Sequence, residues 1–396
     1  MASTALNIIL IAFIAGSVAQ VSIEGSGTTN PSRLFTDAWF PDYKAQSTNF
    51  PTSTIDYRAI GSGGGIADLL ARDNDWAAAD VPLNDDEHVQ LGDTKVLHIP
   101  FLLGAVNIFH NVPSERLSGT LNLTAAVAAK IFQRNITTWD HPDIMADNPG
   151  FTVDANQPIL VVRRKDGSSS TNNLSEYLAS AAPGVWVLGT GKELPFPANT
   201  TEVEGSSAMS DALKANAYTI GYVDVGFGRT NRLVEAALQN QEGEFLTAEE
   251  ANVEAVAQDL NNLPPSNSDK WDELTLINQP GSGVWPVTTF SYFLIYEDLS
   301  FLTREQGQLI VEFIEYALSA KGQNSTEEFG FFPVPEAILT ANAAGIQTIV
   351  LADAGSPTPP PTTPAPSTGT TPPSGSIQTT VSVFFVLICS ALLLLL

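Results

Sequence analysis

The chain has 396 residues, of which 43 are acidic and 18 basic, and its formal net charge is −25. Reading the phosphate backbone of a nucleic acid requires a basic surface, so this balance argues against nucleic-acid binding. With 43% hydrophobic residues, the chain is too apolar for a disordered acidic tail and long enough for two or three domains. The single cysteine, Cys389, and four scattered histidines lack the spacing of a structural metal site, so we expect neither a metal nor a cofactor.

The first 19 residues have the layout of a secretory signal peptide. No residue before Glu24 is charged, an apolar run covers 6–16, and Ser17-Val-Ala19 ends in the small-x-small pattern of a cleavage site. The usual basic residue near the amino terminus is missing, and a buried strand or helix is the alternative. We predict that residues 1–19 are a signal peptide.

Three clusters of glycine and hydroxyl residues, at 25–31, 60–65 and 163–171, each follow a strand-like segment and precede a helical pattern. The first N–H groups of a helix lack intrahelical partners and carry a partial positive charge. Glycine allows an anion to approach the backbone, and serine or threonine adds a further donor. One such cluster is an ordinary helix cap or turn, but three of them predict a site for a tetrahedral anion.

Two long apolar stretches, 98–108 and 284–295, are typical of buried strands. Between them, the acidic and asparagine-rich stretch 239–272 reads as a solvated insertion or surface region.

The carboxyl-terminal region changes composition twice. Residues 353–376 are dominated by Pro, Thr, Ser and Gly, which predicts an extended stalk. Residues 377–396 form an apolar end without a basic flank, and their continuous apolar stretch is shorter than the about 20 residues of a membrane span. A lipid-anchor signal fits better, with attachment near Ser367 or Gly369, or at Ser374, and a short spanning helix is the alternative.

Five asparagines stand in N-glycosylation sequons: Asn122, Asn135, Asn173, Asn199 and Asn324. Together with the two processing signals, they predict a glycoprotein that is anchored at the extracellular face of a eukaryotic plasma membrane.

Seven motifs occur in order between about residues 23 and 335: Gly25-x-Gly-x-Thr29, Gly61-Ser62-x-Gly-Gly, Ala79-Asp80-x-Pro-Leu83, Trp139-Asp140 with Asn148-Pro-Gly150, Arg163-Arg164-x-Asp-Gly-Ser168, Ile220-Gly-Tyr-Val-Asp224 and Trp285-Pro286-Val-Thr. With these motifs the chain resembles the phosphate-binding receptors of bacterial ABC-type phosphate importers, and eukaryotic secreted members of that superfamily are the nearest class.

The resemblance implies an α/β, type II periplasmic-binding-protein fold, with two lobes that are each a sheet flanked by helices. Two hinge crossings would join lobe one, at 20–105 and 286–352, to lobe two, at 106–285. Ligand residues on both lobes imply that the cleft closes on binding.

The resemblance also implies a phosphate site. Its residues would be Thr29, Asn30, Ser62, Asp80, Arg164, Ser168, Ser169 and Ser170. Arg164 would supply the cation, and Asp166 would either hold that guanidinium or simply form the Asp-Gly turn. The family usually has an aromatic residue at Asn30 and glycine at Ser169, so these two positions depart from its pattern.

Asp80 would give the site its selectivity. An ionised carboxylate only accepts hydrogen bonds, so it can pair with the hydroxyl of phosphate but not with sulfate, which has no proton at neutral pH. The favoured function is non-catalytic, high-affinity binding of inorganic phosphate for capture or uptake. A phosphohydrolase-type enzyme, an adhesion or scaffold module with a degenerate oxyanion pocket, and a site for arsenate or phosphonate are the alternatives. The expected partners are phosphate, the membrane and a membrane transporter, and the protein is expected to be a monomer.

Overall fold

The computed structural model describes residues 20–354 with the exception of 259 and 261. The expected signal peptide at 1–19, the stalk from 355 onward and the anchor segment at 377–396 lie outside the described residues. Among the described helices, none is both long and apolar enough to cross a membrane.

Strands of mixed direction are the framework of the fold. They are β1 (Ser22–Gly27), β2 (Thr54–Ala59), β3 (Trp76–Ala79), β4 (Val96–His110), β5 (Leu121–Leu123), β6 (Leu160–Arg164), β7 (Thr201–Val203), β8 (Thr219–Asp224), β9 (Val234–Gln239), β10 (Phe245–Leu246) and β11 (Thr288–Tyr296). Their order is β2-β1-β3-β11-β4-β8-β6-β7, and β9 pairs with β4, β5 and β10. β1 is parallel to β2 and β3, and β6 is parallel to β7 and β8, whereas β11 is antiparallel to β3 and β4.

Helices connect and cover these strands, as a mixed α/β fold requires. The α-helices are α1 (Phe40–Gln46), α2 (Ser62–Ala71), α3 (Asp85–Leu91), α4 (Ala125–Phe132), α5 (Pro142–Asp147), α6 (Ser169–Ala181), α7 (Gly205–Ala215), α8 (Val225–Thr230), α9 (Ala255–Gln258), α10 (Arg304–Leu318), α11 (Ala320–Asn324) and α12 (Glu336–Ile346). Short 3-10 turns lie at η2 (Ser114–Arg116) and η3 (Glu327–Phe329), and a π-helical turn, η1 (Leu34–Trp39), precedes α1.

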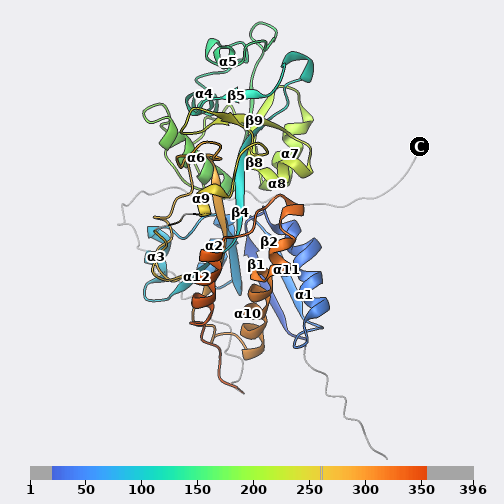
Figure 1. The fold of residues 1–396 in the computed structure, drawn as a ribbon, viewed down its shortest axis with the longest axis vertical. Coiled ribbons are helices and arrows are strands. Elements are labelled where there is room, and N and C mark those ends of the chain that lie inside the picture. The colour runs from blue at the N-terminus through green and yellow to red at the C-terminus, as the bar shows by residue number, and fades with distance from the viewer. Residues whose placement is uncertain (1–19, 259, 261, 355–396) are drawn as a thin grey trace, which may run out of the picture. The chain divides into compact units, whose positions relative to one another are not determined.

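The strand β4 passes through two hydrophobic cores. All 15 of its residues are buried, which confirms the strand expected at 98–108. Up to Ala105 it pairs with β11, and from Val106 it pairs with β8. Figure 1 shows it running from the elements coloured blue and orange into those coloured green. We call the cluster around the early part of β4 the first core and the cluster around its later part the second core.

Aromatic side chains dominate the first core. Phe35 on η1, Phe101 on β4 and Phe293 on β11 are all completely buried or nearly so, and the rings of Phe101 and Phe293 stack with their centroids 4.0 Å apart. Burial of such side chains stabilises a fold by about 1.5–3 kcal/mol each. The expected strand at 284–295 is β11, which begins later, at Thr288, and is buried throughout.

The prediction of a solvated region at 239–272 is wrong in part. Ala257 and Trp271 are buried and pack in the first core, and Asn267 donates from its amide to the backbone oxygen of His98 at 2.7 Å. Periodicity did not reveal these contacts because the segment is mostly irregular and polar, with single apolar residues that become buried. Part of the stretch assigned to lobe two therefore packs with the first core.

Candidate functional site

Strand ends from both cores meet at one place. In the first core, the parallel strands β1, β2 and β3 lead into Thr28, Gly61 and Asp80. In the second core, β6 leads through Asp166 into α6. Beside it, β7 leads into α7, which packs in a smaller third cluster with Phe109 and Val223. Ligands of open α/β sheets bind beyond the carboxyl ends of parallel strands, which makes this the candidate binding site.

Asp80 is the acceptor at the centre of the site. Its side chain is buried, and its Oδ2 accepts hydrogen bonds from Thr28 Oγ1 at 2.5 Å, Asn30 Nδ2 at 2.8 Å and Ser169 Oγ at 2.7 Å. Its Oδ1 accepts a hydrogen bond from Ser291 Oγ at 2.7 Å. Burial raises the pKa of Asp80, and the four donors act in the opposite direction.

The loop that carries Asp80 is fixed by buried neighbours. Thr289 Oγ1 donates to the backbone oxygen of Asp80 at 2.7 Å. His98 Nε2 accepts a hydrogen bond from the backbone N–H of Leu83 at 3.1 Å. Burial lowers the pKa of His98 to about 3, so the ring is neutral and can accept this bond at physiological pH. His98 therefore positions the loop.

Arg164 is the buried cation of the site. Its side chain is 2% exposed, and its guanidinium pairs through two nitrogens with the carboxylate of Asp166. That carboxylate also accepts a hydrogen bond from the backbone N–H of Gly205 at 3.1 Å. Burial by itself raises the pKa of Asp166, but the hydrogen bond and charge of Arg164 outweigh it and hold that pKa below its usual value. Of the two alternatives for Asp166, the structure thus contains the ion pair.

Ser206, at the start of α7, joins the two sides of the site. Its Oγ lies 2.6 Å from Thr29 Oγ1 and 3.2 Å from Asn30 Oδ1, both of which follow β1. Arg164 Nη1 also donates to Ser206 Oγ, at 3.5 Å. The side chain of Asn30 thus bridges Asp80 and Ser206, whereas its backbone N–H lies 3.3 Å from Thr28 Oγ1.

The remaining expected donors lie at two helix starts. Ser62 is the first residue of α2, is fully buried, and accepts a weak hydrogen bond from the backbone N–H of Asp80 at 3.3 Å, which leaves its own proton free to donate. Ser168 caps α6 by accepting from the N–H of Thr171 at 3.4 Å. Ser170 Oγ is buried and has no hydrogen-bond partner among the described residues. A buried hydroxyl without a partner is costly, so Ser170 is well suited to bind a polar ligand.

Close backbone approach between the cores requires glycine. Gly61 has φ +86°, and a Cβ at this residue would lie 2.8 Å from Asp166 Oδ2. The N–H of Gly63 donates to the backbone oxygen of Gly167 at 2.9 Å. The second glycine cluster of the sequence therefore contacts the third directly.

A second buried acid lies near the site. Asp224 at the end of β8 accepts hydrogen bonds from the N–H groups of Gly226 at 2.8 Å and Phe227 at 3.4 Å. Burial, assisted by the negative charge of Asp80, raises the pKa of Asp224 to about 8. Asp224 is thus largely uncharged at neutral pH and adds little to the repulsion of an anion.

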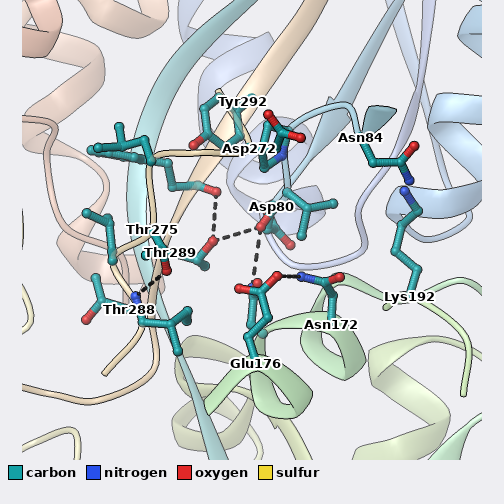
Figure 2. Close-up of a pocket in the computed structure, with 17 residues that line it drawn as sticks. Asp80, Asn84, Asn172, Glu176, Lys192, Asp272, Thr275, Thr288, Thr289 and Tyr292 are labelled. Atoms are coloured by element: carbon teal, nitrogen blue, oxygen red, sulfur yellow. Dashed lines mark hydrogen bonds between the residues drawn. The ribbon is translucent and has the colours of Figure 1, made fainter. Parts of the chain in front are cut away.

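A cavity of about 110 Å³ lies on the backbone side of Asp80. Figure 2 shows Glu176, Asn172 and Thr289 around it, with Lys192 extending toward Asn84. Glu176 accepts a hydrogen bond from Asn172 at 2.7 Å, and burial raises its pKa. No group of three or more His, Cys, Asp or Glu side chains suited to a metal ion occurs in the described part of the chain.

Comparison with known proteins identifies the family. The model of the PBP superfamily domain matches residues 15–321. The chain belongs to the PBP superfamily. A phosphate-binding protein PstS of Haemophilus influenzae is 28% identical over 328 residues, which cover 81% of this chain and 90% of the relative.

Two solved structures of phosphate-binding proteins share the fold. The protein from Stenotrophomonas maltophilia superposes with a TM-score of 0.65 at 18% identity, over 82% of this chain and 94% of that one. A high-affinity periplasmic phosphate-binding protein called PfluDING, solved with bound phosphate, gives a TM-score of 0.64 at 20% identity, over 82% of this chain and 93% of that one. The predicted α/β, type II PBP-like fold and the resemblance to phosphate-binding proteins of the PBP superfamily are confirmed.

The structure brings all eight expected ligand residues, together with Asp166, to the strand ends at which the two cores meet. Sequence reasoning missed three other polar side chains there: Thr28, Ser206 and Ser291. Thr28 belongs to the first cluster and could have been included on that basis. Ser206 and Ser291 had no local signal, because each meets its partner only through the fold.

One expected glycosylation site is wrong. Asn173 is 3% exposed, lies in α6 and donates to the backbone oxygen of Asp80 at 3.4 Å, so this packing leaves no room for a glycan. Asn135, Asn199 and Asn324 are exposed, and Asn122 is half-buried. Glycosylation at these four positions stays a prediction.

Proposed function

We propose that this chain binds inorganic phosphate where its two cores meet and releases it unchanged. The observation that carries the proposal is the convergence of one buried guanidinium, Arg164, and one buried carboxylate, Asp80, from different cores. Hydroxyls at the starts of α2 and α6 surround them. A relative that is 28% identical is named a phosphate-binding protein, which supports the same ligand here.

The roles of the residues follow from their chemistry. Arg164 keeps its charge when buried and matches two oxygens of a phosphate in one plane. Ser62, Ser168 and Ser170 offer hydroxyl donors, and the first N–H groups of α2 and α6 add the partial positive charge of helix starts. These donors act at contact distance, whereas the acidic surface is screened over about 8 Å at physiological salt. Local attraction therefore outweighs the net charge of −25.

Asp80 is proposed to select phosphate over sulfate. A ligand hydroxyl can donate to this buried carboxylate, whereas a fully deprotonated anion presents only lone pairs to it. Leaving a buried charged group without its partner costs about 2–5 kcal/mol. Selection is then mainly rejection of the wrong anion.

We further propose that the first and second cores are two lobes that close over the ligand. The expected boundaries are 20–105 and 286–352 for lobe one and 106–285 for lobe two, with local exceptions where residues near Trp271 pack in the first core. The contact between Gly63 and Gly167 would then belong to the closed form.

The biological setting is also a proposal. A signal peptide at 1–19, a stalk at 353–376 and an anchor signal at 377–396 support display of a monomeric glycoprotein at the outer face of a eukaryotic plasma membrane. We propose that a membrane transporter receives the phosphate, because a structural neighbour from Vibrio cholerae, 17% identical to this chain, is named an ABC-type phosphate transport receptor. Cleavage of the intact cell-surface protein by a phosphatidylinositol-specific phospholipase tests the lipid anchor.

Calorimetric titration of the purified secreted chain with phosphate and sulfate tests the binding function. We expect saturable binding of phosphate with one site per chain and much weaker binding of sulfate. Asp80→Asn should narrow the difference, because it removes the charge that repels sulfate while its amide oxygen can still accept from Thr28 and Asn30. Absence of heat with phosphate would contradict the proposal, and release of phosphate from phosphate esters would favour an enzyme.

A further inference from the structure

Ser206 lies at the start of α7 and contacts the loop that follows β1. Its side chain is fully buried. A Cβ at the preceding residue, Gly205, would lie 3.8 Å from Thr29 Cγ2, so this end of α7 packs against that loop. With the lobe boundaries proposed above, Ser206 belongs to lobe two and Thr29 to lobe one. The contact therefore crosses the cleft.

The hydroxyl of Ser206 uses all of its hydrogen-bonding capacity. A serine hydroxyl donates one hydrogen bond and accepts up to two. Its proton goes to Asn30 Oδ1 at 3.2 Å, because an amide oxygen can only accept. Thr29 Oγ1, at 2.6 Å, must then donate to Ser206, and Arg164 Nη1 donates over a longer distance of 3.5 Å. These hydrogen bonds all run toward Asn30.

Asn30 continues the chain of hydrogen bonds to Asp80. Its amide accepts at Oδ1 and donates at Nδ2, which lies 2.8 Å from Asp80 Oδ2. Hydrogen bonds that follow one another in one direction polarise each other, and they are stronger in a buried site than in water. The aromatic residue that the resembled family usually has at this position lacks an amide that both accepts and donates. The departure at Asn30 is therefore what allows Ser206 to be linked to Asp80.

We propose that Ser206 is a positioning residue that holds the two lobes together through Asn30 while phosphate is bound; this inference rests on the proposed function and on closure of the lobes. In the closed form, the chain of hydrogen bonds joins Thr29, Ser206, Asn30 and Asp80. When the cleft opens, Ser206 separates from Thr29 and Asn30, and water takes its place. The chain thus slows the release of phosphate and contributes nothing to the first encounter with it.

The first test compares Ser206→Ala with Ser210→Ala, a buried serine one turn further along α7. Ser210 Oγ donates to the backbone oxygen of Ser206 at 3.0 Å, so its hydrogen bond stays within the helix. Ser206→Ala leaves Asn30 Oδ1 without its donor in the closed form, and we expect phosphate to dissociate about 5- to 30-fold faster with an unchanged association rate. Ser210→Ala should release phosphate at the wild-type rate, within about twofold.

The second test is a double-mutant cycle between Ser206→Ala and Asn30→Leu, in which leucine keeps a similar size without the amide. If the two side chains act through one chain of hydrogen bonds, the double variant should be at least about threefold better at retaining phosphate than the product of the two single effects predicts. Dissociation is measured as release of radiolabelled phosphate into an excess of unlabelled phosphate. Urea denaturation without phosphate measures the stability of each variant.

Faster release in Ser206→Ala, wild-type release in Ser210→Ala and non-additive effects in the cycle support the inference. Wild-type release in Ser206→Ala, or effects that multiply within about twofold, overturns it and leaves phosphate binding intact. A Ser206→Ala chain that fails to fold, or that loses more stability without phosphate than Ser210→Ala, shows that Ser206 only packs α7 and also overturns the inference. A wild-type chain that binds no phosphate overturns the proposed function itself.

Discussion

The ion pair between Lys192 and Glu87 tests whether the two cores close around the ligand. Lys192 lies in the loop after α6, and its ammonium is 2.5 Å from the carboxylate of Glu87 on α3. The Lys192 and Glu87 side chains are 16% and 11% exposed. The backbone oxygen of Lys192 accepts from the N–H of Ser168 at 3.0 Å, which links this pair to the start of α6 in the candidate site.

The effect on affinity follows from where the pair can form. In an open form both charges would be in water, so the pair contributes only to closure. At an effective dielectric constant of about 20, two charges at about 4 Å attract by about 4 kcal/mol. Desolvation and loss of side-chain freedom offset much of this. A net contribution of about 1–2 kcal/mol changes the dissociation constant by about 5- to 30-fold.

The variants are Lys192→Met, Glu87→Gln and the double substitution, measured by calorimetry with phosphate and by stopped-flow dissociation. Each single variant should bind phosphate about 5- to 30-fold more weakly through faster dissociation, with an unchanged phosphate-to-sulfate ratio. The double variant should be no worse than either single one, because the two side chains act as one unit.

The nearby pair of Asp85 and Lys270 gives a matched control. Its side chains are 75% and 51% exposed, so Asp85→Asn should leave phosphate binding unchanged. Additive effects of the two single variants at Lys192 and Glu87, or normal affinity in both, would refute the role of this pair in closure.

Three further predictions follow from buried groups. Arg164→Ala should weaken the binding of phosphate and of sulfate alike, by at least about 30-fold in calorimetry, because a buried charge-assisted contact to the anion is lost. The variant leaves the carboxylate of Asp166 without its partner, and adding Asp166→Asn to remove that charge should not restore the affinity. Asp224 has its pKa raised to about 8, so its contribution to stability is fully present below pH ~4 and is lost as pH rises to ~8. Urea denaturation should then show Asp224→Asn to be more stable than wild type at pH ~8, by on the order of a few kcal/mol, with a flatter pH profile; equal pH profiles would contradict this. Trp271→Ala should lower the free energy of unfolding by about 3–5 kcal/mol in the same assay, and a loss near zero would contradict its burial in the first core.

The local part of the site could be predicted from the sequence. Glycine and hydroxyl clusters mark the ends of parallel strands, and those ends meet in the fold because parallel strands share one edge. The clusters predicted that Thr29, Ser62 and Ser168 lie between the end of a strand and the start of a helix, which is where the structure has them. The long apolar stretch of β4 was equally informative, because a strand that is buried on both faces has a nearly continuous apolar sequence.

The long-range contacts could not be predicted in the same way. Ser206 meets Thr29, 177 residues away, and Ser291 meets Asp80, 211 residues away. Each is an ordinary serine in its own segment, and its role depends on a partner that only the fold supplies. Asn173 is the opposite case: its sequon is a sound local signal, but the packing of α6 buries it.

A structure of the protein with bound phosphate would show whether Arg164 and Asp80 form the binding site. We expect one phosphate with two oxygens on the Arg164 guanidinium, a hydroxyl donor from Ser170, and its own proton directed at Asp80. Phosphate bound elsewhere, such as in the cavity beside Glu176, with Arg164 still paired only to Asp166, would contradict it.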